Sequence, residues 1–346
     1  MPAPASAAFP ENPVPANPVV VRVWRGGAVE SVHRGTWCLV DDTGTVLAGA
    51  GAYDAAYYAR SSVKALQALP LFETGAAERF ALTEEEIALA VASHSGEPRH
   101  TEVVARLLER LDLGVRHLRC GAHPPTDDAT RAALRERGEA PSALHNNCSG
   151  KHAGFLALAK QLGAPLERYL EPDSEGQRLV RAAIAELCGV SASSLEPAID
   201  GCSAPTHRVP LRALATAFAR VANPDGLPAS RAEAFRRITA AAARHPDLVG
   251  GTSKRIDSDL LAATRGRLFP KIGAESIHVV GVVGARRGLA LKIDDGSPRA
   301  LPVLLTALLE RLDLASASEL DVLGSYRADV MCNHAGLEVG RIEAIV

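Results

Sequence analysis

The sequence lacks the features of a membrane protein and of a nucleic-acid-binding protein. No run of apolar residues is long enough to cross a bilayer as a helix. The formal net charge is −2, and no cluster of lysine and arginine is interleaved with aromatic residues, which excludes a phosphate backbone as the expected partner. Residues 1–18 have neither a basic start nor an apolar segment, so they do not predict a secretory signal. We expect them to form a disordered tail.

Cysteine is too sparse for a disulfide-rich secreted protein. The 346 residues contain six cysteines, which are spread along the chain: Cys38, Cys120, Cys148, Cys188, Cys202 and Cys332. This density is typical of a reducing compartment, and we therefore expect a cytoplasmic protein. Cys148 and Cys202 lie in unusual local sequence and need an explanation other than a disulfide.

Lysine is also scarce. Of 38 basic residues only six are lysines: Lys64, Lys151, Lys160, Lys254, Lys271 and Lys292. Arginine stays protonated in proteins, whereas a buried lysine, or one beside other cations, can become a neutral base. Each lysine in this arginine-rich chain is therefore a candidate for chemistry, and a plain surface role is the alternative.

Strand signals occur at both ends of the chain. Residues 19–24 and 35–49 are rich in β-formers around turn sequences, and strand patterns return at 276–283 and 288–293, before an amphipathic helix at 302–312. The region between is helical in periodicity, with expected helices at 61–69, 84–92, 101–111, 151–162, 176–187, 210–221 and 231–244. We predict an α/β fold whose antiparallel sheet is built from both chain ends, with covering helices and an inserted helical subdomain.

This pattern gives a simple domain organisation. After the tail, residues 19–346 form one unit, because no linker separates independent domains. Its α/β part comprises 19–60 and 266–346, and its helical part comprises 61–265.

A serine and a lysine stand three residues apart at the start of a predicted helix. Ser61 and Lys64 would share one helix face, where a neutral lysine could take the proton of the hydroxyl. The N–H groups of a helix N-terminus could also stabilise an oxyanion. Spacing alone is a weak signal, since serine and lysine often occur three apart by chance.

Two further motifs follow in a specific order. Ser93-His94-Ser95 and Lys271-Ile272-Gly273 complete the series S-x-x-K, S-x-[NS] and K-x-G. In serine β-lactamases and penicillin-binding proteins these three elements line one cleft between an α/β domain and a helical domain. The alternatives are a hydroxyl at a helix C-terminus for Ser93 and a charge at a strand edge for Lys271.

From about residue 19 onward, the sequence resembles the rhizobial-type bacterial L-asparaginases. Five blocks in the same order carry the resemblance: residues 60–64 (RSSVK), 92–97 (ASHSGE), 145–155 (HNNCSGKHAGF), 200–205 (DGCSAP) and 271–275 (KIGAE). The resemblance implies a serine β-lactamase/glutaminase-like fold, a homodimer, and hydrolysis of L-asparagine to L-aspartate and ammonia.

The resemblance also implies roles for particular residues. Two serine–lysine tandems would be catalytic, Ser61 with Lys64 and Ser93 with Lys271. A zinc ion would be held, together with a water, by Cys148, Lys151 and Cys202. Two thiolates suit zinc, and a metal-bound lysine must be neutral, which arginine cannot be. From the residues alone, Cys148 and Lys151 could equally be loop residues, or Cys148 a free buried thiol.

These roles combine into one mechanistic hypothesis. Lys64, kept neutral by burial and by the charge of Lys271, activates Ser61, and Ser93 relays a proton to the leaving ammonia. The oxyanion is held by the backbone N–H groups of Ser61 and Ala274. For the charged ends of the substrate we expect Arg60 at the carboxylate and Asp200 at the ammonium, with Glu275 as a further candidate; local salt bridges are the alternative.

Two other functions fit the same sequence. One is a glutaminase or a penicillin-interacting serine hydrolase, which would use the same serine–lysine chemistry. The other is a zinc-dependent amino-acid binding protein without catalysis, in which the serines are structural. Release of ammonia from asparagine, and its loss in a Ser61 variant, would separate these alternatives from the asparaginase.

Overall fold

The computed structural model describes residues 16–327 and 329–346. Most of the predicted tail, residues 1–15, lies outside this part of the chain. Asn17, which the prediction included in the tail, is buried instead. Its side chain donates to Asp294 Oδ1 at 2.8 Å and accepts from the Ala52 N–H at 2.7 Å. The chain is therefore anchored two residues before the predicted boundary.

The main sheet joins the two ends of the chain. It has eight strands in the order β10-β11-β1-β2-β9-β8-β7, with β3 also paired to β2, and its pairings are antiparallel. The strands are β1 (Val19–Arg25), β2 (Ala28–Asp41), β3 (Val46–Ala50), β7 (Leu268–Gly273), β8 (Ile277–Val282), β9 (Arg287–Ile293), β10 (Asp329–Cys332) and β11 (Glu338–Ala344). The predicted antiparallel sheet built from both chain ends is confirmed.

A second, small sheet lies beside the helical part. It has the order β4-β6-β5, with bounds Ala56–Tyr58, Pro205–Pro210 and Pro197–Ile199 respectively. Strand β4 leads directly into the predicted serine–lysine motif. The Ala59 N–H donates to His207 O at 3.0 Å, which fixes the start of that motif against β6.

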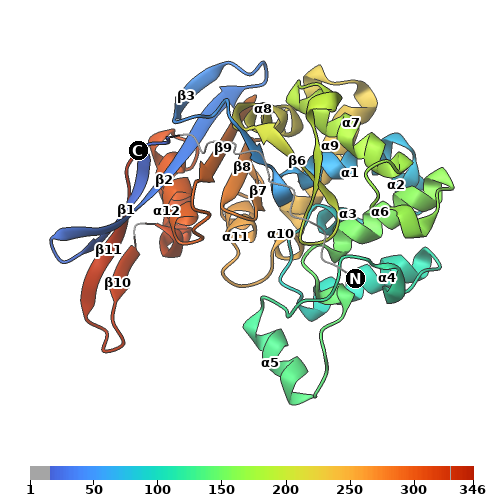
Figure 1. Cartoon of the computed structure of the whole chain (residues 1–346), viewed down its shortest axis with the longest axis horizontal. Helices are drawn as coiled ribbons and strands as arrows, with labels where there is room; N and C mark the ends of the chain where they lie inside the picture. The colour runs from blue at the N-terminus through green and yellow to red at the C-terminus, as the bar shows by residue number, and fades with distance from the viewer. Residues whose placement is uncertain (1–15, 328) are drawn as a thin grey trace, which may run out of the picture.

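Helices occupy most of the middle of the chain, as predicted (Figure 1). They are α1 (Lys64–Glu73), α2 (Ala76–Arg79), α3 (Glu84–Ala90), α4 (Pro98–Arg110), α5 (Asp128–Glu136), α6 (Ser149–Leu162), α7 (Glu175–Cys188), α8 (Leu211–Ala222), α9 (Ala229–Arg244), α10 (Pro246–Val249), α11 (Ile256–Ala263), α12 (Ala300–Arg311) and α13 (Ala317–Val322). None of the helices in the described ranges is both long and apolar enough to span a bilayer.

The two faces of the main sheet are covered by different helices. Helix α8 packs against β2, β8 and β9, and α12 packs against β1, β9 and β11. Successive residues of β2 therefore enter different cores: Cys38 and Val40 belong to the core shared with the helical part, and Trp37 and Leu39 to the core under α12. Strand β8 is buried along its whole length because both of its faces are covered.

Two local predictions near the motifs are corrected. Ser61 was expected to start an α-helix, but Arg60–Val63 form a 3₁₀ turn and α1 begins at Lys64. Helix α11 was not predicted, because its eight residues are too few to show a clear apolar period.

Candidate active site

The turn that carries Ser61 is locally strained. Arg60 has a φ of 49°, in the left-handed region that residues with a side chain seldom adopt. The Lys64 N–H donates to Ser61 O, and side chains three residues apart in a 3₁₀ turn eclipse one another. Ser61 and Lys64 thus lie on the same side of the turn. The half-buried Ser61 hydroxyl makes no hydrogen bond with any residue of the described ranges, so it is free to meet a substrate.

Lys64 is fully buried beneath this turn. Its amine donates to Ala92 O and, at 3.2 Å, to Ser93 Oγ, and no carboxylate of the described residues forms a salt bridge with it. The pKa of Lys64 is lowered to about 8: burial is the main cause, the Cys148 thiol opposes it, and the nearby cations Lys151 and Lys271 add to the lowering. Lys64 can therefore lose its proton near neutral pH.

The Ser93 hydroxyl is positioned by a loop that follows α3. The Ser93 N–H donates to Val249 O at 3.0 Å, and the Arg255 guanidinium donates to Ser93 O. His94 Nε2 lies 2.9 Å from Ser149 Oγ, at the start of α6. These bonds tie the loop to two neighbouring segments, so Ser93 is held against Lys64 rather than left as an unattached hydroxyl after a helix.

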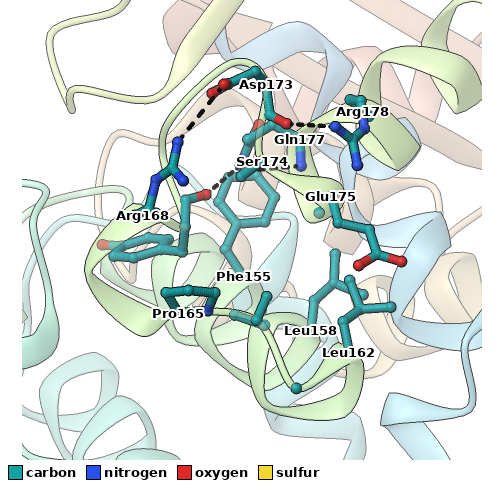
Figure 2. Close-up of a pocket in the computed structure, with 15 residues that line it drawn as sticks. Phe155, Leu158, Leu162, Pro165, Arg168, Asp173, Ser174, Glu175, Gln177 and Arg178 are labelled. Carbon is teal, nitrogen blue, oxygen red and sulfur yellow. Dashed lines mark hydrogen bonds and ion pairs between the residues drawn. The ribbon is translucent and has the colours of Figure 1, made fainter.

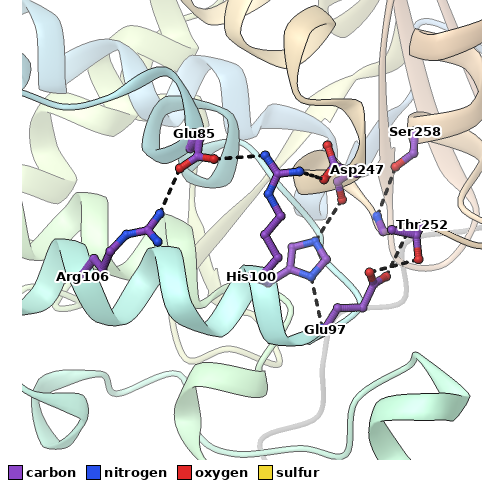
Figure 3. Close-up of polar contacts among 9 residues, drawn as sticks. Glu85, Glu97, His100, Arg106, Asp247, Thr252 and Ser258 are labelled. Atoms are coloured by element: carbon purple, nitrogen blue, oxygen red, sulfur yellow. Dashed lines mark hydrogen bonds and ion pairs between the residues drawn. The ribbon is translucent and has the colours of Figure 1, made fainter.

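Glu97 joins the same loop to the segment before α11 (Figure 3). Its carboxylate accepts from the Thr252 N–H at 2.9 Å and from Thr252 Oγ1 at 3.1 Å. The Glu97 N–H donates to His100 Nδ1, and the other ring nitrogen of His100 lies 3.0 Å from Asp247 O. Ser95 Oγ also donates to Gly250 O at 2.9 Å. The loop that holds Ser93 and the 247–252 segment are therefore fixed to each other.

Lys271 lies on β7 and is also buried, but its surroundings differ from those of Lys64. Its amine donates to Asp257 Oδ2 at 3.0 Å and to Ile272 O at 3.0 Å. Asp257 also accepts from His278 at 2.9 Å. Strand β7 packs against the turn that carries Ser61, and the Lys271 charge lowers the pKa of Lys64. The two lysines of the predicted tandems therefore share one site.

The glycine of the K-x-G motif allows β7 to approach the serine turn. A Cβ atom at Gly273 would lie 3.0 Å from Ala59 O and 3.2 Å from Ser62 N, and 2.5 Å from a methyl carbon of Ile277. Such contacts are too short for a side chain. Gly273 thus sets the distance between the end of β7 and the turn that contains Ser61.

The cysteines and the lysine of the predicted zinc site also come together. Cys148 caps the N-terminus of α6, Lys151 lies one turn later, and Cys202 lies in the turn after β5. Lys151 Nζ is 3.1 Å from Cys202 Sγ, and all three residues are buried. The hydrogen bond from Cys202 lowers the pKa of Cys148, helped by Lys64 and Lys151 and opposed by burial.

This set fits a zinc ion chemically, since it brings two sulfur donors and one nitrogen donor into a buried space. No group of three or more histidine, cysteine, aspartate and glutamate side chains in the described ranges could hold a metal. Here the third donor is a lysine. The zinc therefore stays a prediction.

The residues expected to bind the charged ends of a substrate fall in two places. Arg60 and Asp200 form a salt bridge with an N–O distance of 2.8 Å beside the serine turn. This is the local ion pair that was the alternative to substrate binding. Ala274 and Glu275 are exposed in the turn after β7 and line a cavity of about 380 Å³, together with Asp257 and Tyr326. Arg60 directly precedes Ser61 and brings Asp200 to the serine turn, whereas the second pair lies at the end of β7.

A larger cavity, of about 420 Å³, lies elsewhere between α6 and α7 (Figure 2). Its floor is apolar, with Phe155 and Leu158 among the lining residues. Two arginines at its rim meet Asp173: Arg168 lies 3.6 Å from Asp173 Oδ2, and Arg178 donates to the backbone carbonyl of Asp173 at 2.8 Å. None of the predicted catalytic or zinc-binding residues lines this cavity.

The structure thus gathers Ser61, Lys64, Ser93, Lys271 and the zinc-site residues around one centre. The hydrogen bonds differ from the predicted tandems, because Lys64 bonds to Ser93, and Lys271 bonds to Asp257. Neither Asp257 nor His278 was among the predicted site residues. The available signal was indirect: a buried lysine that keeps its charge needs an acidic partner, and Asp257 is an acidic residue shortly before Lys271.

Comparisons with known proteins identify the family of this chain. The family model described as L-asparaginase II matches residues 21–344, so the chain belongs to the L-asparaginase II family. Membership defines it as a hydrolase. The search of curated proteins gave no match. Among solved structures, a β-lactamase from Mycobacterium bovis is similar at 15% identity and a TM-score of 0.38, over 80% of this chain and 94% of that chain.

Proposed function

We propose that this protein is an L-asparaginase, which hydrolyses L-asparagine to L-aspartate and ammonia through Ser61. The observation that carries this proposal is the state of Lys64. It is a fully buried amine without a carboxylate partner in the described ranges, one turn from a free serine hydroxyl and 3.2 Å from a second one. Such an amine serves as a base near neutral pH.

The first half of the reaction acylates the enzyme. Lys64 takes the proton of Ser61, and Ser61 Oγ attacks the side-chain amide carbon of asparagine. As the tetrahedral intermediate collapses, the C–N bond breaks and the nitrogen leaves as ammonia. Its proton comes from protonated Lys64 by way of the Ser93 hydroxyl, and the 3.2 Å contact between these two groups supports this relay.

The second half returns the enzyme to its starting state. A water molecule gives a proton to neutral Lys64 and attacks the acyl carbon, which releases aspartate and restores the Ser61 hydroxyl after the proton returns. The backbone N–H groups of Ser61 and Ala274 hold the oxyanion in both halves. The close packing of Gly273 on the serine turn supports this role for the adjacent Ala274.

Recognition of the amino-acid end of the substrate falls to charged residues beside Ser61. Arg60 binds the α-carboxylate and Asp200 binds the α-ammonium, each giving up part of its bond to the other. Burial raises the pKa of Asp200, but the hydrogen bond and charge of Arg60 outweigh it and lower the pKa, so Asp200 is ready as an anion. Glu275, exposed at the end of β7, is a further candidate for the ammonium.

Cys148, Lys151 and Cys202 hold a zinc ion in this proposal. When bound, zinc supplies a fixed positive charge and a coordinated water next to Lys64. Because Ser61 and Lys64 already provide nucleophile and base, the metal tunes affinity or local order.

The setting we propose is a cytoplasmic homodimer. The six cysteines are all free, which supports a reducing compartment.

Ammonia release from asparagine by the wild type and by Ser61→Ala tests the proposal. Loss of the nucleophile should lower kcat by about 10³-fold or more. Ser62→Ala is the matched control, because the Ser62 hydroxyl is already used within the same turn, where it donates to Ala59 O at 2.6 Å. The kcat of this variant should stay within about fivefold of wild type. Binding of asparagine without turnover in the wild type would favour an amino-acid binding protein. Faster turnover of glutamine, or acylation by a β-lactam, would favour the related hydrolases.

A further inference from the structure

A buried carboxylate outside the predicted site holds Lys271. Asp257, on the first turn of α11, is 3% exposed and accepts three hydrogen bonds. Lys271 Nζ lies 3.0 Å and the Ile272 N–H nitrogen 2.9 Å from Oδ2, and His278 Nε2 lies 2.9 Å from Oδ1. A buried carboxylate with three donors is stable only as an anion.

The two buried lysines of the site therefore have opposite surroundings. Lys64 donates to a carbonyl and a hydroxyl, and the neighbour that raises its pKa is the Cys148 thiol rather than a carboxylate. Lys271 faces a full negative charge, which favours its ammonium form. One lysine is suited to act as a base and the other to remain a cation.

We propose that Asp257 is a positioning residue that keeps Lys271 charged and directed into the active site, with His278 fixing the orientation of the carboxylate. This inference rests on the proposed function of the site. It goes beyond that function in assigning the two lysines different tasks: Lys64 moves protons, and Lys271 supplies a fixed positive charge for the developing oxyanion.

The other groups around Lys271 do not replace Asp257. Burial lowers the pKa of Lys271, the charge and hydrogen bond of Asp257 raise it, Arg255 lowers it, and the Cys148 thiol raises it by a smaller amount. Lys64 from α1 and His278 from β8 also face this region. Asp257 is the only residue of the described ranges that forms a salt bridge with Lys271.

His278 acts as a hydrogen-bond donor to Asp257. Because the acceptor is a carboxylate, the proton belongs on Nε2. Nδ1 is buried and has no partner in the described ranges, so a second proton there would be left without an acceptor. His278 thus occupies Oδ1 and leaves Oδ2 for Lys271.

The test is the pH titration of Lys271, followed by NMR of protein labelled with ¹³C in its lysine side chains, of which the chain has six. The chemical shift of the ε-carbon changes when the amine loses its proton, and it does so for a buried amine as well, so the midpoint of the curve reports the loss of the proton. In Asp257→Asn the midpoint should move to lower pH by about one unit or more, because the compensating charge is gone. In Asp259→Asn, which alters the next carboxylate of α11, it should stay at the wild-type value. An unchanged midpoint in Asp257→Asn would overturn the proposal.

A second pair of variants covers the case in which Asp257→Asn does not fold. Removing one member of a buried ion pair is strongly destabilising, whereas replacing both is tolerated. Thermal unfolding should therefore show that Asp257→Asn/Lys271→Met regains most of the stability lost in Asp257→Asn. A double variant as unstable as the single one would contradict a role through Lys271.

Activity gives a third readout that separates the two proposals. The alkaline limb of kcat/KM for asparagine should shift to lower pH in Asp257→Asn, in parallel with the NMR titration curve of Lys271. A uniform loss at every pH would indicate a merely structural role and count against the proposal. A wild type that releases no ammonia would refute the proposed asparaginase, yet the NMR titration of Lys271 would still decide the role of Asp257.

Discussion

The Lys64 amine lies 3.2 Å from the Ser93 hydroxyl, measured from Nζ to Oγ, although 28 residues separate the two in the chain. The predicted tandems had instead paired Lys64 with Ser61 and Ser93 with Lys271. The contact makes a continuous path for a proton between the base and a second hydroxyl. Lys64 is also one turn from Ser61, so in the proposed mechanism a single amine serves both serines. That mechanism is organised around Lys64 as the base and Lys271 as a fixed cation.

The first prediction concerns the acidic limb of the pH profile. Burial lowers the pKa of Lys64 to about 8, and only the neutral amine can accept the proton of Ser61. Below this pKa, kcat/KM for asparagine should fall by about tenfold for each pH unit. Steady-state assays between pH 6 and 9.5 measure this limb. A profile that is flat over the whole range would rule out Lys64 as the base.

Replacement of Lys64 by arginine sharpens this test. Lys64→Arg keeps a positive charge but cannot supply a neutral nitrogen, so turnover should be lost at every pH. Lys160→Arg is the control, since Lys160 lies at the end of α6 and donates to Leu111 O, outside the site. Comparable activity of the two variants would speak against base catalysis by Lys64.

The scarcity of lysine predicted part of this site. Lys64, Lys151 and Lys271 are all buried around one centre, whereas Lys254 is exposed. A chain that uses arginine for its surface keeps lysine where a neutral amine or a compact cation is needed. The separate tasks of Lys64 and Lys271 could not be predicted, because they depend on which partner each amine meets in space.

Asp257 escaped prediction for a related reason. It stands at the start of an eight-residue helix without a clear apolar period, and an acidic residue there is typical of any helix N-terminus. Its function depends on α11 packing against β7, and on the register that places His278 opposite Ile272. The sheet itself was predictable, because strand signals at both chain ends are local.

The second prediction concerns the glycine between β7 and the serine turn. In Gly273→Ala the new Cβ would lie 3.0 Å from Ala59 O, so the turn and the strand must move apart by a few tenths of an ångström. A displacement of the nucleophile on this scale should lower kcat by about 10- to 100-fold. Gly226→Ala, where a Cβ meets nothing within 4 Å, should keep wild-type kinetics. Equal kcat values for the two variants would show that the close approach has no catalytic importance.

The third prediction separates substrate binding from a local ion pair at Arg60. Arg60→Gln should raise KM for asparagine by about tenfold or more, because a charged hydrogen bond to the α-carboxylate is lost. The control is Arg212→Gln, which breaks an exposed ion pair with Asp54 of N–O distance 2.7 Å. An unchanged KM in Arg60→Gln would leave Arg60 with the Asp200 salt bridge as its sole role.

The fourth prediction concerns removal of zinc. If Cys148, Lys151 and Cys202 hold the metal, chelation should raise KM or lower the unfolding temperature while turnover at saturating asparagine persists. Complete and reversible loss of that turnover would instead give the metal a direct part in the chemistry. Cys148→Ala should bind no zinc, whereas Cys188→Ala, at the buried end of α7, should bind it as the wild type does.

The same site predicts how zinc affinity depends on pH. Without metal, the Cys202 thiol has a raised pKa, chiefly because of its hydrogen bond to Cys148, and the pKa of Lys151 is raised by both sulfurs against the effect of burial. Zinc requires both thiolates and a neutral amine, so binding must release protons from Cys202 and Lys151. Affinity should therefore rise with pH, by about tenfold per unit for each proton released. Competition with a chromophoric chelator between pH 6 and 8 measures the slope, and a slope of zero would exclude Lys151 and Cys202 as ligands.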